Sequence, residues 1–340
     1  MYSDEDLDAA VAAGALSAEA AASFRAHVAG MRNTPAVDEE HFRLVTGFND
    51  IFVVIASLLL LTSVGWIAST MTGWAGSLAA AATAWALAEF FVRKRRMALP
   101  AIVLLIAFCG DVFFAVFSPV KDAIADPIKS VVAAVAIAGL VTVAATWAHW
   151  KRFHVPITVA AGAAALSASL VAMLLYWVPA ARNWISPIIF GAGAAIFVAA
   201  LRWDASDVKR ETRRSDIAFW LHLLAAPLLV HPVFQVLGIT SGQGDIPRAL
   251  IAMALYVAIG LVSLAVDRRA LMVSALGYVL YAFTALLKNN GVVSLSFALT
   301  ALVIGSALLL LSAFWQASRR FALEKLPSSV TSRLSPVRGA

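Results

Sequence analysis

Ten apolar blocks constrain the fold of this 340-residue chain more than any other feature of its sequence. Each block is about 20 residues long, which as a helix rising roughly 1.5 Å per residue is enough to cross the hydrocarbon of a bilayer. The blocks are continuous rather than alternating, which excludes a transmembrane β-barrel. We therefore predict an all-α, polytopic membrane helix bundle. The predicted spans cover residues 51–70, 73–92, 98–118, 128–150, 155–178, 184–202, 217–239, 246–266, 270–287 and 292–316.

The distribution of basic residues predicts how the chain crosses the membrane. Cytoplasmic loops of membrane proteins carry an excess of Lys and Arg. With the N-terminus inside, 21 of the 26 Lys and Arg residues fall on the cytoplasmic side. Ten spans then place both termini in the cytoplasm. Topology thus explains the net charge of +6, and we expect no nucleic-acid partner.

The polar ends of the chain are predicted to lie in the cytoplasm. In residues 1–50, Gly14 ends one short helix and Ser17 caps a second, which predicts a helical hairpin. Two short helices cannot bury a core of their own, so we expect the hairpin to bind the bundle, another copy of the chain or a protein partner. Residues 51–316 form the predicted transmembrane domain. Residues 317–340 are predicted to be a largely disordered tail.

The stretch LDAAVAAGALSAEAAASF, residues 7–24, resembles the opening of an uncharacterised family of bacterial multi-pass membrane proteins, a domain of unknown function. Members of that family begin with a helix, a Gly-x-Leu/Ile-Ser turn and a second helix. The matching positions are Leu7, Gly14, Leu16, Ser17, Glu19 and Ala20. The resemblance implies a bacterial inner membrane protein and supplies no catalytic residues.

No motif of a soluble enzyme class occurs in the sequence. H-E-x-x-H, Walker A and G-x-S-x-G patterns are absent, and the single Cys109 excludes an intramolecular disulfide or a thiolate zinc cluster. We therefore expect no catalytic activity, no metal and no cofactor. The layout of ten helices with both ends inside resembles the drug/metabolite transporter superfamily in helix number. The helix-ending proline and later membrane glutamate of that superfamily are missing.

Small residues are abundant in three of the spans, at 79–88, 160–169 and 191–195. Glycine and alanine allow helices to approach closely in lipid. These stretches predict tight helix–helix packing rather than the lining of a pore.

A few polar residues lie deep in the predicted spans. An ionisable group at the centre of a span costs about 2.5 to 3.5 kcal/mol on insertion scales, so each one needs a physical reason. Asp111 and His231 both lie roughly 20 Å from the cytoplasmic ends of their helices, so they would share a proton or form an ion pair if those helices touch. Gln235 follows one turn after His231 on the same face. We predict that Asp111, His231 and Gln235 bind a proton or a ligand, with a structural hydrogen bond between helices as the alternative.

Four further residues are secondary candidates for such a site: Glu89, His222, Tyr278 and Tyr281. Each has a plainer interpretation. Glu89 precedes Arg93 by four residues, which is typical of an intrahelical ion pair. His222 lies near the membrane interface beside Trp220, which indicates an anchor, and single tyrosines are usually packed in the core.

Pro227 and Pro232 lie in the same span as both histidines. Each proline removes a backbone hydrogen bond. Broken helices surround many transporter sites, but simple kinks are an equally good interpretation.

These features favour a small-solute transporter or permease that is proton-linked. The main alternative is a non-catalytic membrane sensor or scaffold whose N-terminal hairpin binds a partner. An intramembrane enzyme ranks third, because it would need a clearer cluster of acid, nucleophile or metal ligands.

Overall fold

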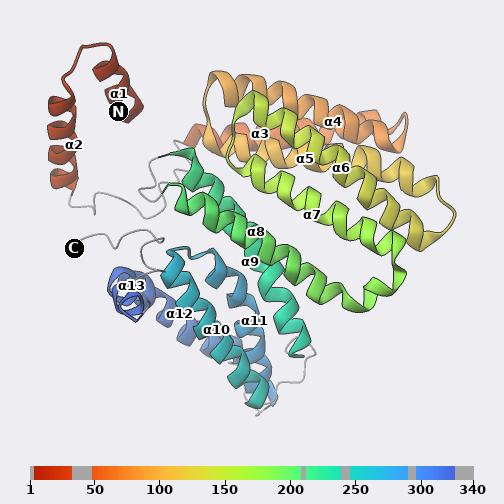
Figure 1. Ribbon diagram of the computed structural model, residues 1–340. Coiled ribbons are helices and arrows are strands. Elements are labelled where there is room, and N and C mark those ends of the chain that lie inside the picture. The colour runs from red at the N-terminus through yellow and green to blue at the C-terminus, as the bar shows by residue number, and fades with distance from the viewer. Residues whose placement is uncertain (1–3, 33–47, 208–211, 239–245, 290–295, 326–340) are drawn as a thin grey trace. The chain divides into compact units, whose positions relative to one another are not determined.

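A computed structural model describes residues 4–32, 48–207, 212–238, 246–289 and 296–325. The described residues are helices joined by short turns, with no strand among them (Figure 1). The chain divides into two compact units, Met1–Leu44 and Val45–Ala340.

The first unit is a helical hairpin of α1 (Asp4–Ala12) and α2 (Ala18–Arg32). Gly14 adopts a positive φ of 71° just after α1, and the Ser17 hydroxyl accepts a hydrogen bond from the Ala20 amide at the start of α2. Asp8 and Arg25 join the two helices through an ion pair of 2.7 Å. The predicted helix end and helix cap are both confirmed. Residues 33–47 of the N-terminal segment lie outside the described residues.

Seven helices of the second unit are long and apolar enough to cross a membrane. They are α3 (Phe48–Ser69), α4 (Gly73–Ala88) with its π-helical continuation η1 (Glu89–Lys94), α5 (Ala98–Asp122), α6 (Pro127–Phe153), α7 (Ile157–Trp177), α8 (Ile185–Ala205) preceded by the 3₁₀ turn η2 (Pro179–Trp184), and α9 (Arg213–Val236). The chain is an integral membrane protein of the helical class. Multiple membrane crossings agree with the sequence prediction.

Three further helices follow α9 at the positions of the last three predicted spans. They are α10 (Ile246–Val266), α11 (Ala270–Asn289) and α12 (Ser296–Ala313). The described parts of α10 and α11 include shorter apolar stretches, Leu250–Val266 and Met272–Thr284. The count of ten spans and the orientation of the termini stay predictions.

The start of the C-terminal tail is ordered as a short helix. Residues 317–323, predicted to be disordered, belong to α13 (Trp315–Leu323). Trp315 and Arg319 are buried, and the Trp315 indole donates a hydrogen bond to Asp267 at 2.9 Å. A helix with two buried anchors does not behave as a solvated tail. Residues 326–340 lie outside the described residues.

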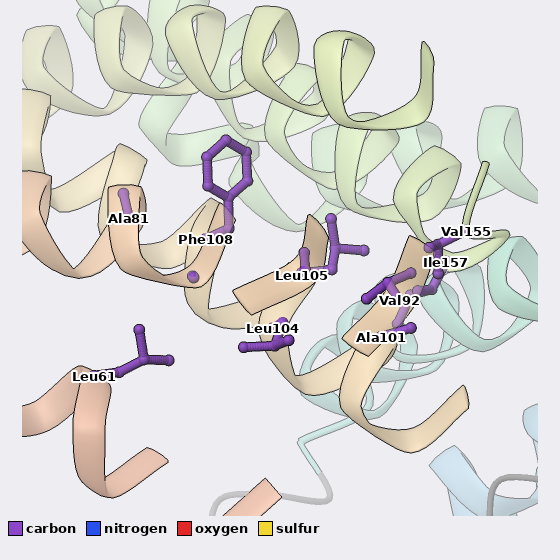
Figure 2. Close-up of a cluster of buried hydrophobic side chains, with 11 residues drawn as sticks. Leu61, Ala81, Val92, Ala101, Leu104, Leu105, Phe108, Val155 and Ile157 are labelled. Carbon is purple, nitrogen blue, oxygen red and sulfur yellow. The ribbon is translucent and has the colours of Figure 1, made fainter. Parts of the chain in front are cut away.

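Helices that follow one another in the chain pack together in most cases, which is typical of bundles with short loops. Helix α9 also packs against α7 and α11, so it links the α3–α8 helices to the later ones. The largest buried cluster lies between α3, α4, α5 and α7. Figure 2 shows Leu104 and Phe108 of α5 among the other side chains of this cluster.

The small residues perform the packing role that the sequence predicts. A Cβ at Gly193 of α8 would lie 2.8 Å from the Leu228 Cβ of α9, and one at Gly162 of α7 would lie 2.9 Å from the Thr146 hydroxyl of α6. At Gly193 the Cβ would also meet the Leu228 backbone, so only glycine fits there, whereas at Gly162 the Thr146 side chain would have to shift. The prediction of close helix packing is confirmed for these two helix pairs.

Candidate functional site

Helix α9 is the most buried of the seven apolar helices. Half of its most apolar stretch is buried, compared with 11% for α3. It continues through both Pro227 and Pro232 without interruption. The helix is therefore not broken at mid-membrane, although both prolines lack the backbone N–H of an ordinary helical residue.

The C-terminal half of α9, which the predicted orientation places on the outer side, carries a group of polar contacts to two neighbouring helices. The His231 Nδ1 and the Tyr278 hydroxyl of α11 lie 2.5 Å apart. The Phe234 ring packs against the Tyr278 ring with centroids 4.8 Å apart. The Ser186 hydroxyl of α8 donates to the Gln235 side-chain oxygen at 2.9 Å. The structure thus brings together two predicted candidates, His231 and Tyr278.

The polar groups of this site differ in exposure. His231 and Gln235 are exposed, and Tyr278 is half-buried. Tyr281, one turn from Tyr278 on α11, is 44% exposed. We call His231, Gln235, Tyr278 and Ser186 the outer polar site.

Asp111 lies apart from the outer polar site. It is half-buried on α5, and within the described part of the chain it has no hydrogen bond or ion pair. Helix α5 packs against α3, α4, α6 and α7, whereas α9 packs against α7, α8 and α11. The predicted sharing of a proton between Asp111 and His231 is not seen, and His231 has Tyr278 as its partner. Equal depth in a bundle does not make two helices lateral neighbours.

A second polar cluster lies near the N-terminal half of α9. The His222 Nε2 lies 2.8 Å from Asp204 of α8, and Arg268, in the turn between α10 and α11, donates to the other Asp204 oxygen at 2.5 Å. Arg268 also donates to the Ser215 carbonyl at 3.1 Å. We call Asp204, His222 and Arg268 the buried triad.

The buried triad changes the interpretation of His222. The imidazole has no exposed surface, and Arg268 is only 2% exposed. His222 is therefore a buried polar partner rather than the interfacial anchor that its neighbour Trp220 indicated. Asp204 and Arg268 were missed because both lie in segments that the sequence assigned to loops. No local spacing relates residues that are 64 positions apart.

Glu89 forms two ion pairs at the end of α4. Arg93 lies 3.4 Å away on the same helix, which confirms the pair predicted from the i,i+4 spacing. Arg152, at the end of α6, makes a shorter bidentate contact of 2.6 and 2.9 Å. The sequence did not indicate Arg152, because this contact depends on how α4 and α6 pack.

One buried histidine was overlooked in the sequence. His149 of α6 is 1% exposed, and its Nδ1 lies 3.2 Å from the Thr158 hydroxyl of α7. Its ring is enclosed by Trp85, Phe108 and Phe153. This enclosure is apolar and filled by rings, which favours a structural role for His149.

Among the described residues, no group of three or more His, Cys, Asp and Glu side chains is placed to hold a metal ion. No known protein family, curated protein or solved structure matches this chain. The resemblance of residues 7–24 to an uncharacterised membrane family therefore stays a prediction.

Proposed function

We propose that this chain is a proton-linked permease for a small solute, with His231 as a proton-binding group of the transport path. The observation that carries the proposal is the exposure of His231 and Gln235 on the most buried apolar helix. Ionisable residues within membrane spans almost always face the bundle interior or a water-filled cavity. An exposed histidine in a span therefore favours access to water.

The partner of His231 supports proton exchange. A neutral imidazole and a phenol at 2.5 Å share one hydrogen bond. When the imidazole binds a proton on both nitrogens, Nδ1 becomes a donor and the Tyr278 hydroxyl must act as the acceptor. If the neutral imidazole carries its proton on Nε2, so that Nδ1 accepts from Tyr278, protonation reverses the direction of this hydrogen bond between α9 and α11. This reversal gives a proton a way to alter the contact between two helices.

The buried triad supports the same proposal from the other end of α9. Asp204, His222 and Arg268 tie α9 to α8 and to the α10–α11 turn. Because these groups are buried and paired, we assign them a structural role, which is to hold the N-terminal half of α9 against its neighbours. The exposed outer half of the helix is then the part that responds to protons or solute.

The test measures proton flux into liposomes containing the purified protein and an internal pH-sensitive dye. The outside is acidified while potassium and valinomycin clamp the membrane potential. We expect wild-type flux above that of protein-free liposomes, and a loss of about tenfold or more in His231→Gln. His27→Gln, in the exposed N-terminal hairpin, is the matched control and should retain wild-type flux.

Three outcomes would count against the proposal. Wild-type flux equal to that of protein-free liposomes would contradict proton-linked transport. An unchanged flux in His231→Gln would contradict the assignment of His231 as the proton-binding group. Asp111→Asn is measured separately, because Asp111 lies on a helix that packs away from α9. If Asp111→Asn abolishes flux and His231→Gln does not, the proton path runs through α5 instead.

A sensor or scaffold is the second candidate, favoured by the separate N-terminal unit. Phe24 on α2 remains 47% exposed in that hairpin, as a surface for a partner would be. Deleting residues 1–34 distinguishes the candidates. A permease keeps its proton flux after this deletion, whereas a sensor has no such flux and loses its cellular effect.

A further inference from the structure

Two basic runs far apart in the sequence meet at one end of the bundle. The first is Arg93 to Arg96, at the end of η1, and the second is Lys151 and Arg152, at the end of α6. The Glu89–Arg152 contact of 2.6 Å brings these two runs together. The six cationic side chains of the two runs therefore lie at neighbouring helix ends, and we call them the basic surface.

Glu89 neutralises only part of this charge. Its two carboxylate oxygens are occupied by Arg152 and Arg93. Lys94, Arg95 and Lys151 are exposed, and within the described part of the chain none of the three forms an ion pair. These three cations, at or just beyond the neighbouring ends of η1 and α6, therefore have no anionic partner among the described residues.

Aromatic rings lie beside all three cations, and the Lys94 ammonium lies 6.0 Å from the centre of the Phe90 ring. The Lys151 ammonium lies 5.5 Å from the centre of the Trp147 ring, and the Arg95 guanidinium lies 5.6 Å from the centre of the Phe90 ring. The Trp147 ring is 64% exposed and the Phe90 ring is 42% exposed. An exposed tryptophan at a helix end is typical of the interfacial belt, where lipid headgroups meet acyl chains.

We propose that the basic surface binds the headgroup of an anionic phospholipid. The phosphate contacts Lys94, Arg95 and Lys151, and the acyl chains lie along the exposed rings of Phe90 and Trp147. Basic pockets between transmembrane helices bind anionic lipid headgroups by the same chemistry. A free phosphate would match the cations equally well, but it would leave the adjacent rings exposed, so the rings favour a lipid.

A role in membrane orientation alone does not account for this arrangement of basic and aromatic residues. The positive-inside bias needs basic residues in loops, but it does not need them to converge from two loops or to stand beside exposed rings. If the residues served only for orientation, their exchange would not change how the folded protein responds to different lipids.

The test uses the purified full-length protein, stripped of lipid in a neutral detergent. Binding is followed by thermal unfolding as cardiolipin, phosphatidylcholine or inorganic phosphate is added at equal phosphate concentration. We expect cardiolipin to raise Tm in a saturable manner, and phosphatidylcholine and inorganic phosphate to leave it unchanged. An equal rise with inorganic phosphate, or no rise with cardiolipin, would overturn the proposal.

The decisive variant is the triple change Lys94→Gln, Arg95→Gln and Lys151→Gln. Each basic residue near an anionic surface contributes roughly fivefold, so the apparent affinity for cardiolipin should fall by about a hundredfold. The matched control is Arg202→Gln, Arg213→Gln and Arg214→Gln, which removes three exposed charges at the ends of α8 and α9. This control should retain the affinity, and an equal loss in both triple variants would contradict a specific site.

The Tm of the Lys94, Arg95 and Lys151 triple variant without lipid is measured in the same experiment. The three substituted side chains are exposed, so the lipid-free Tm should equal that of the wild type. Neither substitution set touches the outer polar site. Failure of the lipid site therefore leaves the proposed permease function untouched.

Discussion

At the scale of single residues, the buried triad encloses charged groups that need partners within the protein. Arg268 places a permanent charge almost completely out of solvent, balanced by Asp204 and by the Ser215 carbonyl. Its backbone carbonyl accepts a hydrogen bond from the Ser263 hydroxyl at 2.5 Å. A buried ion pair adds little net stability, because desolvation offsets the attraction. Removing one partner alone is costly, because the other charge stays buried.

We therefore expect Arg268→Met to lower the free energy of unfolding by about 3 to 5 kcal/mol. The methionine fills similar space but leaves the Asp204 carboxylate with His222 as its remaining partner in the triad. Unfolding in detergent, followed by tryptophan fluorescence, measures the change. Arg202→Met, at an exposed position on the same helix as Asp204, should be nearly neutral.

The double variant Asp204→Asn with Arg268→Met tests why Arg268→Met is destabilising. If an uncompensated carboxylate is responsible, the double variant should be more stable than Arg268→Met alone. A double variant that is less stable by the sum of both single effects would show that the two residues act independently.

Residue-level prediction from the sequence worked where contacts are local. Glu89 and Arg93 follow the i,i+4 rule, so their contact could be predicted without a structure. Arg152, Asp204 and Arg268 could not be found, because their partners lie on other helices. Depth counting ranked Asp111 and His231 as partners, but depth carries no information on lateral order.

At the scale of helices, close approach between α8 and α9 depends on one glycine of the GAGAA stretch. A Cβ at Gly193 would lie 2.8 Å from the Leu228 Cβ and 2.9 Å from its backbone carbonyl carbon. Backbone atoms cannot move aside as a flexible side chain can. Gly191, two positions earlier, has nothing within 4 Å of such a Cβ.

These two glycines form a matched pair for mutation. Gly193→Ala should lower the free energy of unfolding by about 1 to 3 kcal/mol, because overpacking forces α8 and α9 apart. Gly191→Ala should raise it by roughly 0.5 to 1 kcal/mol, because alanine restricts the unfolded chain and favours a helix. Thermal unfolding of both variants in the same detergent measures the difference. A Gly193→Ala variant as stable as Gly191→Ala would contradict the tight contact.

Helix positions could be predicted because they depend on the length of each apolar stretch and on the residues at helix ends, and both can be seen within a short segment of sequence. The hairpin break at Gly14 and the cap at Ser17 are examples. Two elements were not predictable. The π-helix η1 has no distinct sequence pattern, and α13 depends on the contact of Trp315 with Asp267, which lies 48 residues earlier.

At the scale of the whole molecule, apolar surface is the dominant property of the membrane unit. Leu59, Trp66 and Leu309 expose 64%, 79% and 74% of their surface, and they belong to a long series of exposed large apolar side chains. A soluble monomer rarely exposes contiguous apolar surface on this scale, so lipid is the natural solvent for these helices. The basic residues, by contrast, gather near helix ends, where they determine orientation.

The predicted orientation places Glu19 and Glu324 on the same side of the membrane and Met71 on the other. All three are exposed in the structure. We expect Met71→Cys, in a Cys109→Ser background, to react with a membrane-impermeant maleimide in intact cells. Glu19→Cys and Glu324→Cys should react only after the membrane is permeabilised. Cys109→Ser alone provides the background signal. An even number of spans requires the two terminal positions to behave alike, so labelling of only one of them in intact cells would show that the prediction of ten spans is wrong.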